Sequence, residues 1–188
     1  MGFTGSHGVP NALDVVLDAA KLLRDVPVSF VLVGDGMEKA RLQRRVADER
    51  IDNVAMFPPV PKQQIPPLLR RFDIAYIGWQ RLPIYRFGIA PNKLMDYMMA
   101  GCTVLHSVEA GNDPVAEAGC GLTVAPESPQ AVADGVRQLL TVAAAERRAM
   151  GERGMQFILR HHTYEVLARR FLDAAGPPAL ALPAEVLV

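Results

Sequence analysis

The chain has 188 residues, half of them hydrophobic and about a fifth charged, which is the composition of an ordinary globular domain with one sizeable core. Its 20 basic and 20 acidic side chains cancel, so the charge balance favours neither a nucleic acid nor an anionic membrane as the main partner. Two cysteines without metal-ligand spacing are too few for a disulfide framework. No apolar run approaches the ~20 residues that span a bilayer, and the first residues do not resemble a signal peptide, so we expect a cytoplasmic protein.

Strand-like and helix-like segments alternate along the sequence. Residues 10–23 carry apolar side chains at helical spacing, and residues 28–33 (VSFVLV) form an almost wholly apolar run, typical of a central parallel strand. In chain order we expect strands at 2–4, 28–33, 54–57, 74–77, 103–107 and 122–124, and helices at 10–23, 37–50, 62–72, 91–100, 114–118, 129–140, 143–159 and 163–174. Residues 78–90 are expected to be irregular, and residues 176–188, which include three prolines, to form a poorly ordered tail.

This alternation predicts an α/β fold, a Rossmann-like doubly wound parallel sheet of about six strands with helices on both faces. Residues 1–175 are expected to form it as one domain. Ligands of such sheets bind at the carboxyl ends of strands, close to the N-termini of helices. Three places are therefore candidate binding positions: the loop after the first strand, the turn after residue 33 and the start of the helix at 91–100.

The first candidate is the glycine loop Gly5-Ser6-His7-Gly8, which we call the 5–8 turn. Glycines there would let the backbone approach a ligand closely, and free N–H groups at a helix start favour a phosphate. An ordinary strand-to-helix turn explains the same residues equally well. The turn at 34–36 leaves two similar interpretations open: its two glycines could lie under a nucleotide, or the turn could merely begin the next helix.

The segment 91–101 is the most informative part of the sequence. Lys93 and Asp96 are three residues apart at the start of a predicted helix, so their side chains share a face near its positive end. A lysine there suits a diphosphate, and a carboxylate one turn further on suits ribose hydroxyls. The alternative is an ordinary ion pair between the two side chains on a solvated face.

An ordered set of short motifs runs through most of the chain. The set comprises Gly5-x-x-Gly8, Leu32-Val33-Gly34-Asp35-Gly36, Asn53-Val54-x-Met56-Phe57, Asp73-Ile74, Lys93-Leu94-x-Asp96-Tyr97-Met98-x-Ala100-Gly101, Gly119-x-Gly121-Leu122 and Met150-Gly151. Together the motifs resemble the C-terminal Rossmann-like domain of family-4 retaining glycosyltransferases, over residues 2–173. The resemblance implies a GT-B fold, in which two such domains face each other across a cleft. It also implies a sugar transfer that needs no metal and retains the anomeric configuration.

The resemblance assigns roles by position. Asp96 corresponds to the second of two family acids, the one that binds the donor ribose, whereas the first acid would fall at Gly88 and is absent. The arginine and lysine that commonly grip the diphosphate would fall near Ser6 and Asn11 and are also absent. The resemblance therefore implies that Lys93 takes over the phosphate contact.

The form Pro-Asn-Lys-Leu-x-Asp-Tyr-Met resembles a branch that builds bacterial surface polysaccharide and lipopolysaccharide O-antigen from UDP-linked sugars. Backbone around Val60 and Pro61 corresponds to its nucleobase pocket. The expected donor-binding residues are Gly5, Ser6, His7, Gly8, Gly34, Gly36, Val60, Pro61, Asn92, Lys93, Leu94 and Asp96. No metal and no cofactor is expected, since the nucleotide-sugar is a substrate.

The acceptor, a glycan or a lipid-linked glycan, would bind an N-terminal domain that this chain lacks. That domain would also provide any peripheral contact with the inner face of the cytoplasmic membrane. We therefore expect the isolated half to be inactive, and its catalytic residues stay unassigned.

Two other functions stand beside this one. A non-hydrolysing UDP-N-acetylglucosamine 2-epimerase shares the GT-B fold, although the segment after Val104 lacks the acidic and basic set expected around its sugar. A nucleotide-binding module without catalysis is the other alternative. An oxidoreductase is disfavoured, because the 5–8 turn is not followed by the third glycine of the dinucleotide fingerprint.

Overall fold

The computed structural model describes residues 1–176. Its six strands form one parallel sheet in the order β3-β2-β1-β4-β5-β6. They are β1 (Gly2–Ser6), β2 (Phe30–Asp35), β3 (Val54–Phe57), β4 (Ile74–Gly78), β5 (Thr103–Ser107) and β6 (Gly121–Thr123). This is the strand order of a doubly wound Rossmann-like sheet, so the fold class predicted from the sequence is confirmed.

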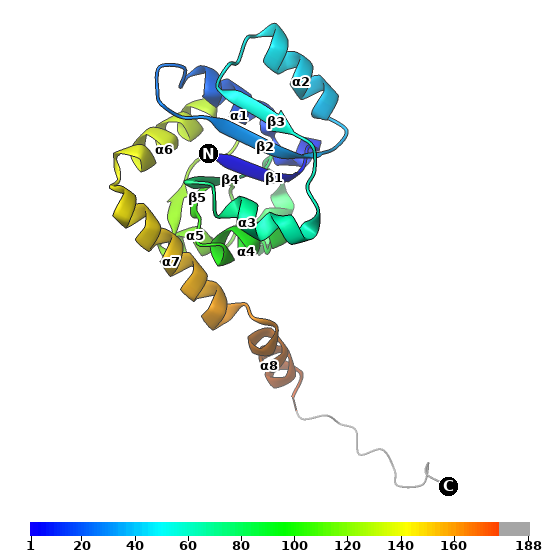
Figure 1. Ribbon diagram of the computed structural model, residues 1–188. Helices are drawn as coiled ribbons and strands as arrows, with labels where there is room; N and C mark the ends of the chain where they lie inside the picture. Colours follow the sequence, from blue (N-terminus) through cyan, green and yellow to red (C-terminus); the bar gives the residue numbers. More distant parts are fainter. Residues whose placement is uncertain (177–188) are drawn as a thin grey trace.

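Helices cover both faces of the sheet (Figure 1). They are α1 (Leu13–Lys21), α2 (Lys39–Asp48), α3 (Ile65–Leu69), α4 (Asn92–Met99), α5 (Pro114–Ala118), α6 (Pro129–Thr141), α7 (Ala144–His161) and α8 (Tyr164–Ala175). α1, α2 and α6 pack on one face in a cluster that includes Leu17 and Val136. α3, α4, α5 and α7 pack on the other face in a cluster that includes Leu94 and Ile158. Burial of these two apolar layers against the sheet supplies the main stabilisation of the fold.

Two helix starts differ from the sequence prediction by three residues, whereas α2 starts two residues later than predicted and α4, α7 and α8 one residue later. The helix predicted at 10–23 begins three residues later as α1, because a 3-10 turn, η1 (Val9–Asn11), precedes it and Ala12 adopts a left-handed conformation with a φ of 47°. The helix predicted at 62–72 is divided into η2 (Lys62–Gln64) and α3, whose second and third residues are prolines that lack the N–H of a continuous helix. The segment predicted to be irregular contains a further 3-10 turn, η3 (Pro83–Phe87).

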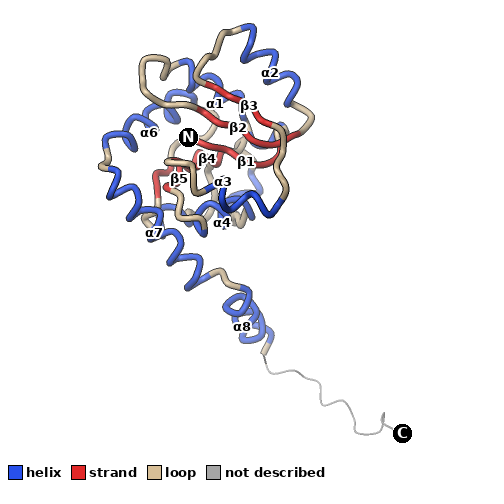
Figure 2. Tube along the Cα trace, in the orientation of Figure 1, coloured by secondary structure: helices blue, strands red, loops and turns tan. Residues whose placement is uncertain are grey.

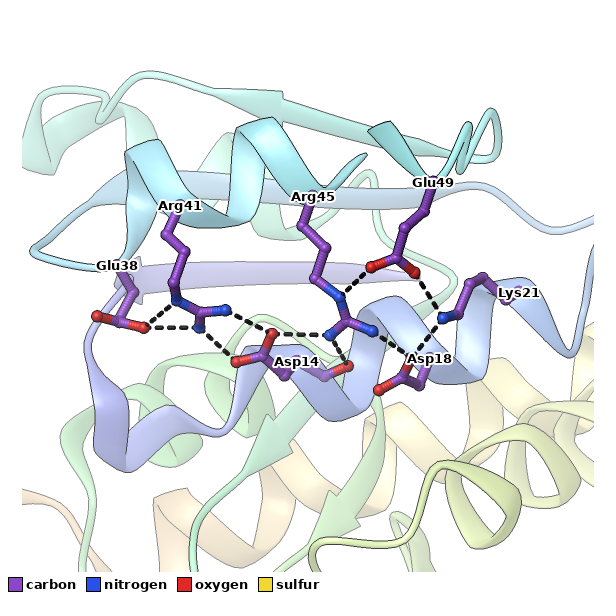
Figure 3. Close-up of polar contacts among 7 residues, drawn as sticks. All are labelled: Asp14, Asp18, Lys21, Glu38, Arg41, Arg45 and Glu49. Carbon is purple, nitrogen blue, oxygen red and sulfur yellow. Dashed lines mark hydrogen bonds and ion pairs between the residues drawn. The ribbon is translucent and has the colours of Figure 1, made fainter. Parts of the chain in front are cut away.

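A charge network fastens α2 to α1, as Figure 3 shows. α2 buries only Leu42, so apolar packing alone holds it weakly. Arg45 lies between the two helices and donates to Asp14 at 2.7 Å, to Glu49 at 2.6 Å and to Asp18. Hydrogen bonds from Arg45 and from a lysine of α1 hold the pKa of the Glu49 carboxyl at about 2. The network also contains Lys21, Glu38 and Arg41.

The last described helices lead away from the sheet. α7 packs on α4 and β5, and α8 extends beyond the body of the domain (Figure 2). α8 buries none of its residues, and Arg170 donates to the Nδ1 atom of His161 in α7 at 3.2 Å. No helix within residues 1–176 has the length and apolar character that crossing a bilayer requires. Of the tail predicted at 176–188, all but Gly176 lies outside the described residues.

Candidate functional site

β1 and β4 separate toward the carboxyl edge of the sheet. The two strands are hydrogen-bonded neighbours only around the pair Gly2 and Ala75, near their amino ends. Beyond that point the hydroxyl of Tyr97, from α4, takes the place of the missing strand partner, since it accepts from Thr4 N at 2.8 Å and donates to Thr4 O at 3.2 Å. The connection that follows β1 runs over one face of the sheet, and the connection that follows β4 runs over the other face. Doubly wound sheets bind their ligands at the position between two such strands.

The 5–8 turn lies at this edge, but its first two residues, Gly5 and Ser6, end β1 and pair with β2, so only His7 and Gly8 form the predicted loop. Gly5 and Ser6 are exposed, whereas His7 is fully buried. The backbone of His7 is fixed by the neighbouring loop, because its N–H donates to Asp35 O at 2.7 Å and its carbonyl accepts from Glu38 N at 3.0 Å. The turn does not run directly into α1, so no long helix starts at Gly8. An anion bound at this turn would therefore contact the backbone of the turn and the neighbouring side chains, and it would lie away from the positive end of α1.

His7 is unusual within the turn because its ring nitrogens, Nδ1 and Nε2, are both buried without a hydrogen-bond partner in residues 1–176. Burial is the main cause that lowers the pKa of His7 from its ordinary value, and the charge of Lys39 adds to the effect. The ring is therefore neutral at pH 7 and packs beneath the turn, 6.0 Å from the ring of Phe3.

The glycines at 34 and 36 are explained by contacts within the chain. A Cβ atom at Gly34 would lie 1.9 Å from Gly5 O, and one at Gly36 would lie 2.6 Å from His7 O. Both residues also have positive φ angles, 150° and 155°, which disfavour any side chain. The close approach of the ends of β1 and β2, and of the loops that follow them, thus requires both glycines, whatever binds beside them.

Lys93 reaches the 5–8 turn from α4. Its ammonium donates to Asn11 Oδ1 at 2.6 Å and lies 4.4 Å from the centre of the Phe3 ring. A Cβ atom at Gly5 would lie 3.2 Å from the Lys93 Nζ atom, so the glycine leaves room for the ammonium. Asn11 in turn donates from Nδ2 to Ser6 O at 2.9 Å. These contacts hold a cation against the turn.

No carboxylate of residues 1–176 pairs with the ammonium of Lys93. Burial alone lowers the pKa of Lys93 to about 8, and no opposite charge counteracts that effect. The interpretation of Lys93 and Asp96 as an ordinary ion pair is therefore wrong for this structure. An ammonium held at a turn with no counter-ion is an arrangement that an anionic ligand would stabilise.

Asp96 lines a groove that Lys93 does not line, and the two charges do not act on each other, so the prediction that the two side chains share a face is wrong. A groove of about 260 Å³ between η2, α3 and α4 is lined by Asp96, Lys62 and Ile65, among others. Burial raises the pKa of the Asp96 carboxyl, and the charge of Lys62 opposes that rise. Val60, which is half-buried, and the exposed Pro61 directly precede Lys62, so the loop after β3 leads to the rim of this groove.

The two remaining candidates differ in exposure. Asn92 is exposed at the start of α4. Leu94 is fully buried, and its backbone N–H already donates to Pro91 O at 3.0 Å. Leu94 therefore acts as a core residue that fixes α4, and its side chain offers nothing to a ligand.

Sequence reasoning missed the roles of Asn11 and Phe3. Asn11 was considered only as the place where a family lysine is absent, yet its amide holds the lysine that reaches the same spot from α4. Phe3 was predicted only as part of a strand. The two contacts join residues more than 80 positions apart, and no local pattern shows such a pairing.

Comparison with known proteins places the chain in a family. The family described as "Glycosyl transferases group 1" matches residues 1–142. A putative colanic acid biosynthesis glycosyl transferase, WcaI of Escherichia coli (strain K12), is 30% identical over 142 residues, which are 73% of this chain and 34% of that protein. The chain therefore spans about a third of the length of this relative.

Solved structures share the fold at low sequence identity. TarM of S. aureus, in a complex that contains UDP, superposes with a TM-score of 0.78 and 15% identity, over 94% of this chain and 35% of that one. The C-terminal domain of LpcC, a group 1 family protein from Francisella tularensis, gives a TM-score of 0.69 and 18% identity, over 87% of this chain and 86% of that one. With the family match, these similarities show that the chain belongs to the group 1 glycosyltransferases and has the fold of their C-terminal GT-B domain.

Proposed function

We propose that the chain binds the donor of a retaining glycosyltransferase, a UDP-linked sugar, at the carboxyl ends of β1 and β4. The full enzyme would build lipopolysaccharide or another bacterial surface polysaccharide, O-antigen included. The single observation that supports this proposal most strongly is the ammonium of Lys93, which lies against the 5–8 turn without a carboxylate partner in residues 1–176.

A diphosphate satisfies this position chemically. Lys93 lies in the first turn of α4, where the helix dipole favours an anion, and Gly5, exposed at the end of β1, lies beside it. An anion that joins the ammonium would offset the desolvation that now lowers the pKa of Lys93. Such a contact would also stabilise the charge that develops on the departing nucleoside diphosphate, as transfer of the sugar requires.

We propose that the nucleotide spans two separate places on α4, with its diphosphate at Lys93 and its ribose at Asp96. Asp96 lies one helical turn beyond Lys93, in the groove that the loop around Val60 and Pro61 approaches. We place the ribose hydroxyls at the Asp96 carboxylate and the base at the backbone of that loop. A uracil base is favoured because the complex of TarM contains UDP. Asn92, Gly8 and His7 would border the diphosphate rather than bind it through a charge.

The acceptor would bind the part of the enzyme that this chain does not contain. We propose a glycan or lipid-linked acceptor, held by a second domain that contacts the inner face of the cytoplasmic membrane peripherally. The nucleotide-sugar is a substrate, and its diphosphate would be met by Lys93 and backbone N–H groups without a metal or another cofactor. No side chain described at the carboxyl ends of β1 and β4 favours epimerisation of the sugar over its transfer.

Calorimetry tests the proposal directly. The chain is titrated with UDP, GDP and ADP, and so are two variants, Lys93→Met and Lys21→Met. Lys21 is the matched control, because its ammonium lies in the network between α1 and α2 and is paired with two carboxylates. We expect UDP to bind the wild type and the control, and to bind Lys93→Met about tenfold to a hundredfold more weakly, the loss of one charged hydrogen bond. Absence of heat with all three nucleotides would refute the donor site.

A further inference from the structure

Asn11 occupies a position that only an amide satisfies. It is 8% exposed, at the end of η1. Its Oδ1 accepts from the ammonium of Lys93 at 2.6 Å, and its Nδ2 donates to the carbonyl of Ser6 at 2.9 Å. The ammonium can only donate and the carbonyl can only accept, so these two partners fix the orientation of the amide.

We propose that Asn11 is a positioning residue that holds the ammonium of Lys93 beside the 5–8 turn as an unneutralised cation for a diphosphate. The inference rests on the proposed function, because it assigns Asn11 to the same anion site. Asn11 itself needs no contact with the nucleotide. It acts through Lys93.

The choice of an amide over a carboxylate is the central physical point. An aspartate at position 11 would also accept from Lys93, but its charge would neutralise the ammonium and compete with an incoming phosphate. Its second oxygen would face the carbonyl of Ser6 without a proton to donate. A leucine of similar size would provide neither hydrogen bond. Asparagine thus anchors the lysine and leaves its charge available.

The chain itself provides the contrasting case. Lys21 donates to Asp18 at 2.7 Å and to Glu49 at 2.6 Å. These hydrogen bonds raise the pKa of Lys21, whereas the pKa of Lys93 is lowered to about 8. Lys21, with two carboxylates, has its charge satisfied within the fold. Lys93, with an amide, does not.

Two further groups complete the cradle of the ammonium. The ring of Phe3 lies 4.4 Å from Nζ and offers its face to the cation. Gly5 contributes open space, since its missing Cβ atom would lie 3.2 Å from Nζ. A lysine ammonium carries three N–H donors. Asn11 uses one and Phe3 faces another, which leaves a donor for a phosphate oxygen.

The test compares Asn11→Asp and Asn11→Leu with the wild type. Asn53→Asp is the matched control, because the amide of Asn53 also donates to a backbone carbonyl, Ala20 O at 2.9 Å, but lies in a different loop. Two quantities are measured: the titration of Lys93 without ligand, from the NMR signals of its Cε and Nζ atoms, and the affinity for UDP by calorimetry. Stability to denaturant is recorded for each variant.

We expect the titration midpoint of Lys93 to rise in Asn11→Asp and to fall in Asn11→Leu, with Asn53→Asp like the wild type. UDP affinity should fall about tenfold or more in both Asn11 variants. In a Lys93→Met background, Asn11→Leu should leave UDP affinity where Lys93→Met alone puts it, whereas the carboxylate of Asn11→Asp should still repel the diphosphate. A purely structural role would lower stability and affinity together, without opposite shifts of the lysine.

Two results would overturn the inference. One is a Lys93 midpoint that is the same in Asn11→Asp and Asn11→Leu. The other is wild-type UDP affinity in either variant. If the wild type itself binds no UDP, the proposed function fails and the role of Asn11 fails with it, although the ligand-free titration would still report whether the amide holds the lysine.

Discussion

Replacing Lys93 by methionine should stabilise the free chain at pH 7 while it weakens nucleotide binding. Methionine keeps most of the length of the lysine stem but removes the ammonium. In the free chain that ammonium lies among Asn11, Phe3 and Gly5 with no carboxylate of the described residues beside it. Its removal therefore relieves a charge that burial disfavours.

The size of the effect follows from the pKa. Burial lowers the pKa of Lys93 from 10.5 to about 8, and each unit corresponds to about 1.4 kcal/mol, so the charged form is disfavoured in the folded chain by up to about 3 kcal/mol. Lys93→Met also loses the hydrogen bond to Asn11 and the contact with Phe3, and this loss reduces the gain in stability by about 1–2 kcal/mol. We expect a net gain of about 1 kcal/mol, which raises the Tm of a domain of this size by about 2–4 °C.

The sign of the pH dependence is fixed by the same values. Below pH 8 the wild-type lysine is charged in both the folded and the unfolded chain, and the full penalty is present. Between pH 8 and 10.5 the unfolded chain binds more protons than the folded chain, so the wild type gains stability as the pH rises. The advantage of Lys93→Met, about 1 kcal/mol at pH 7, should therefore vanish within about one pH unit above pH 8 and reverse toward pH 10.

Denaturant unfolding of the wild type, Lys93→Met and the control Lys21→Met from pH 7 to pH 10 measures this difference. Lys21→Met should be less stable than the wild type, because it leaves two carboxylates without their partner. A Lys93→Met variant less stable than the wild type at pH 7, or a stability difference that does not change with pH, would show that burial does not disfavour the charged form of Lys93.

Three further predictions concern other groups. With a Lys93 pKa of about 8, about half of the free chains have lost this proton at pH 8 and most have lost it at pH 9. UDP binding should therefore take up about half a proton at pH 8 and nearly one at pH 9, seen as a binding heat that varies with the ionisation enthalpy of the buffer; equal heats in all buffers would contradict it. Arg45→Met should lower stability by about 1 kcal/mol and move the pKa of Glu49 from about 2 back toward 4.5, a shift that a titration by NMR would show or deny. Gly34→Ala should destabilise the chain by more than about 3 kcal/mol in denaturant unfolding, because its Cβ atom would lie 1.9 Å from Gly5 O, and a loss below 1 kcal/mol would mean that the loops can separate.

Apolar patterning predicted the layers of this fold well. The strands at 54–57 and 103–107 were predicted with the bounds that the structure shows, and the helix at 129–140 ends one residue early. Buried strands and amphipathic helices can be predicted because the spacing of their apolar residues is a local property of the sequence. Helix starts were predicted less well, since the left-handed conformation of Ala12 and the break before α3 depend on how the loops pack.

The candidate site was predictable only in part. The motif around Lys93 indicated a cation near a glycine turn, and the structure places the lysine there. What the sequence does not show is the set of partners that decides the state of that cation. Asn11 and Phe3 come from the other end of the chain, and the absence of a carboxylate partner for Lys93 in residues 1–176 is a property of the folded arrangement. The glycines at 34 and 36, by contrast, turned out to be required by the fold itself.

The most direct test of a diphosphate beside Lys93 is an NMR titration of the isotope-labelled chain with UDP. We predict that the largest shifts occur at the amides of Gly5, Ser6 and Gly8 and at the Nζ signal of Lys93, with smaller shifts at Asp96, and that Lys93→Met abolishes the shifts of the turn. Shifts confined to another part of the surface, such as the groove of about 470 Å³ beside Arg81 and Glu109, would contradict the account.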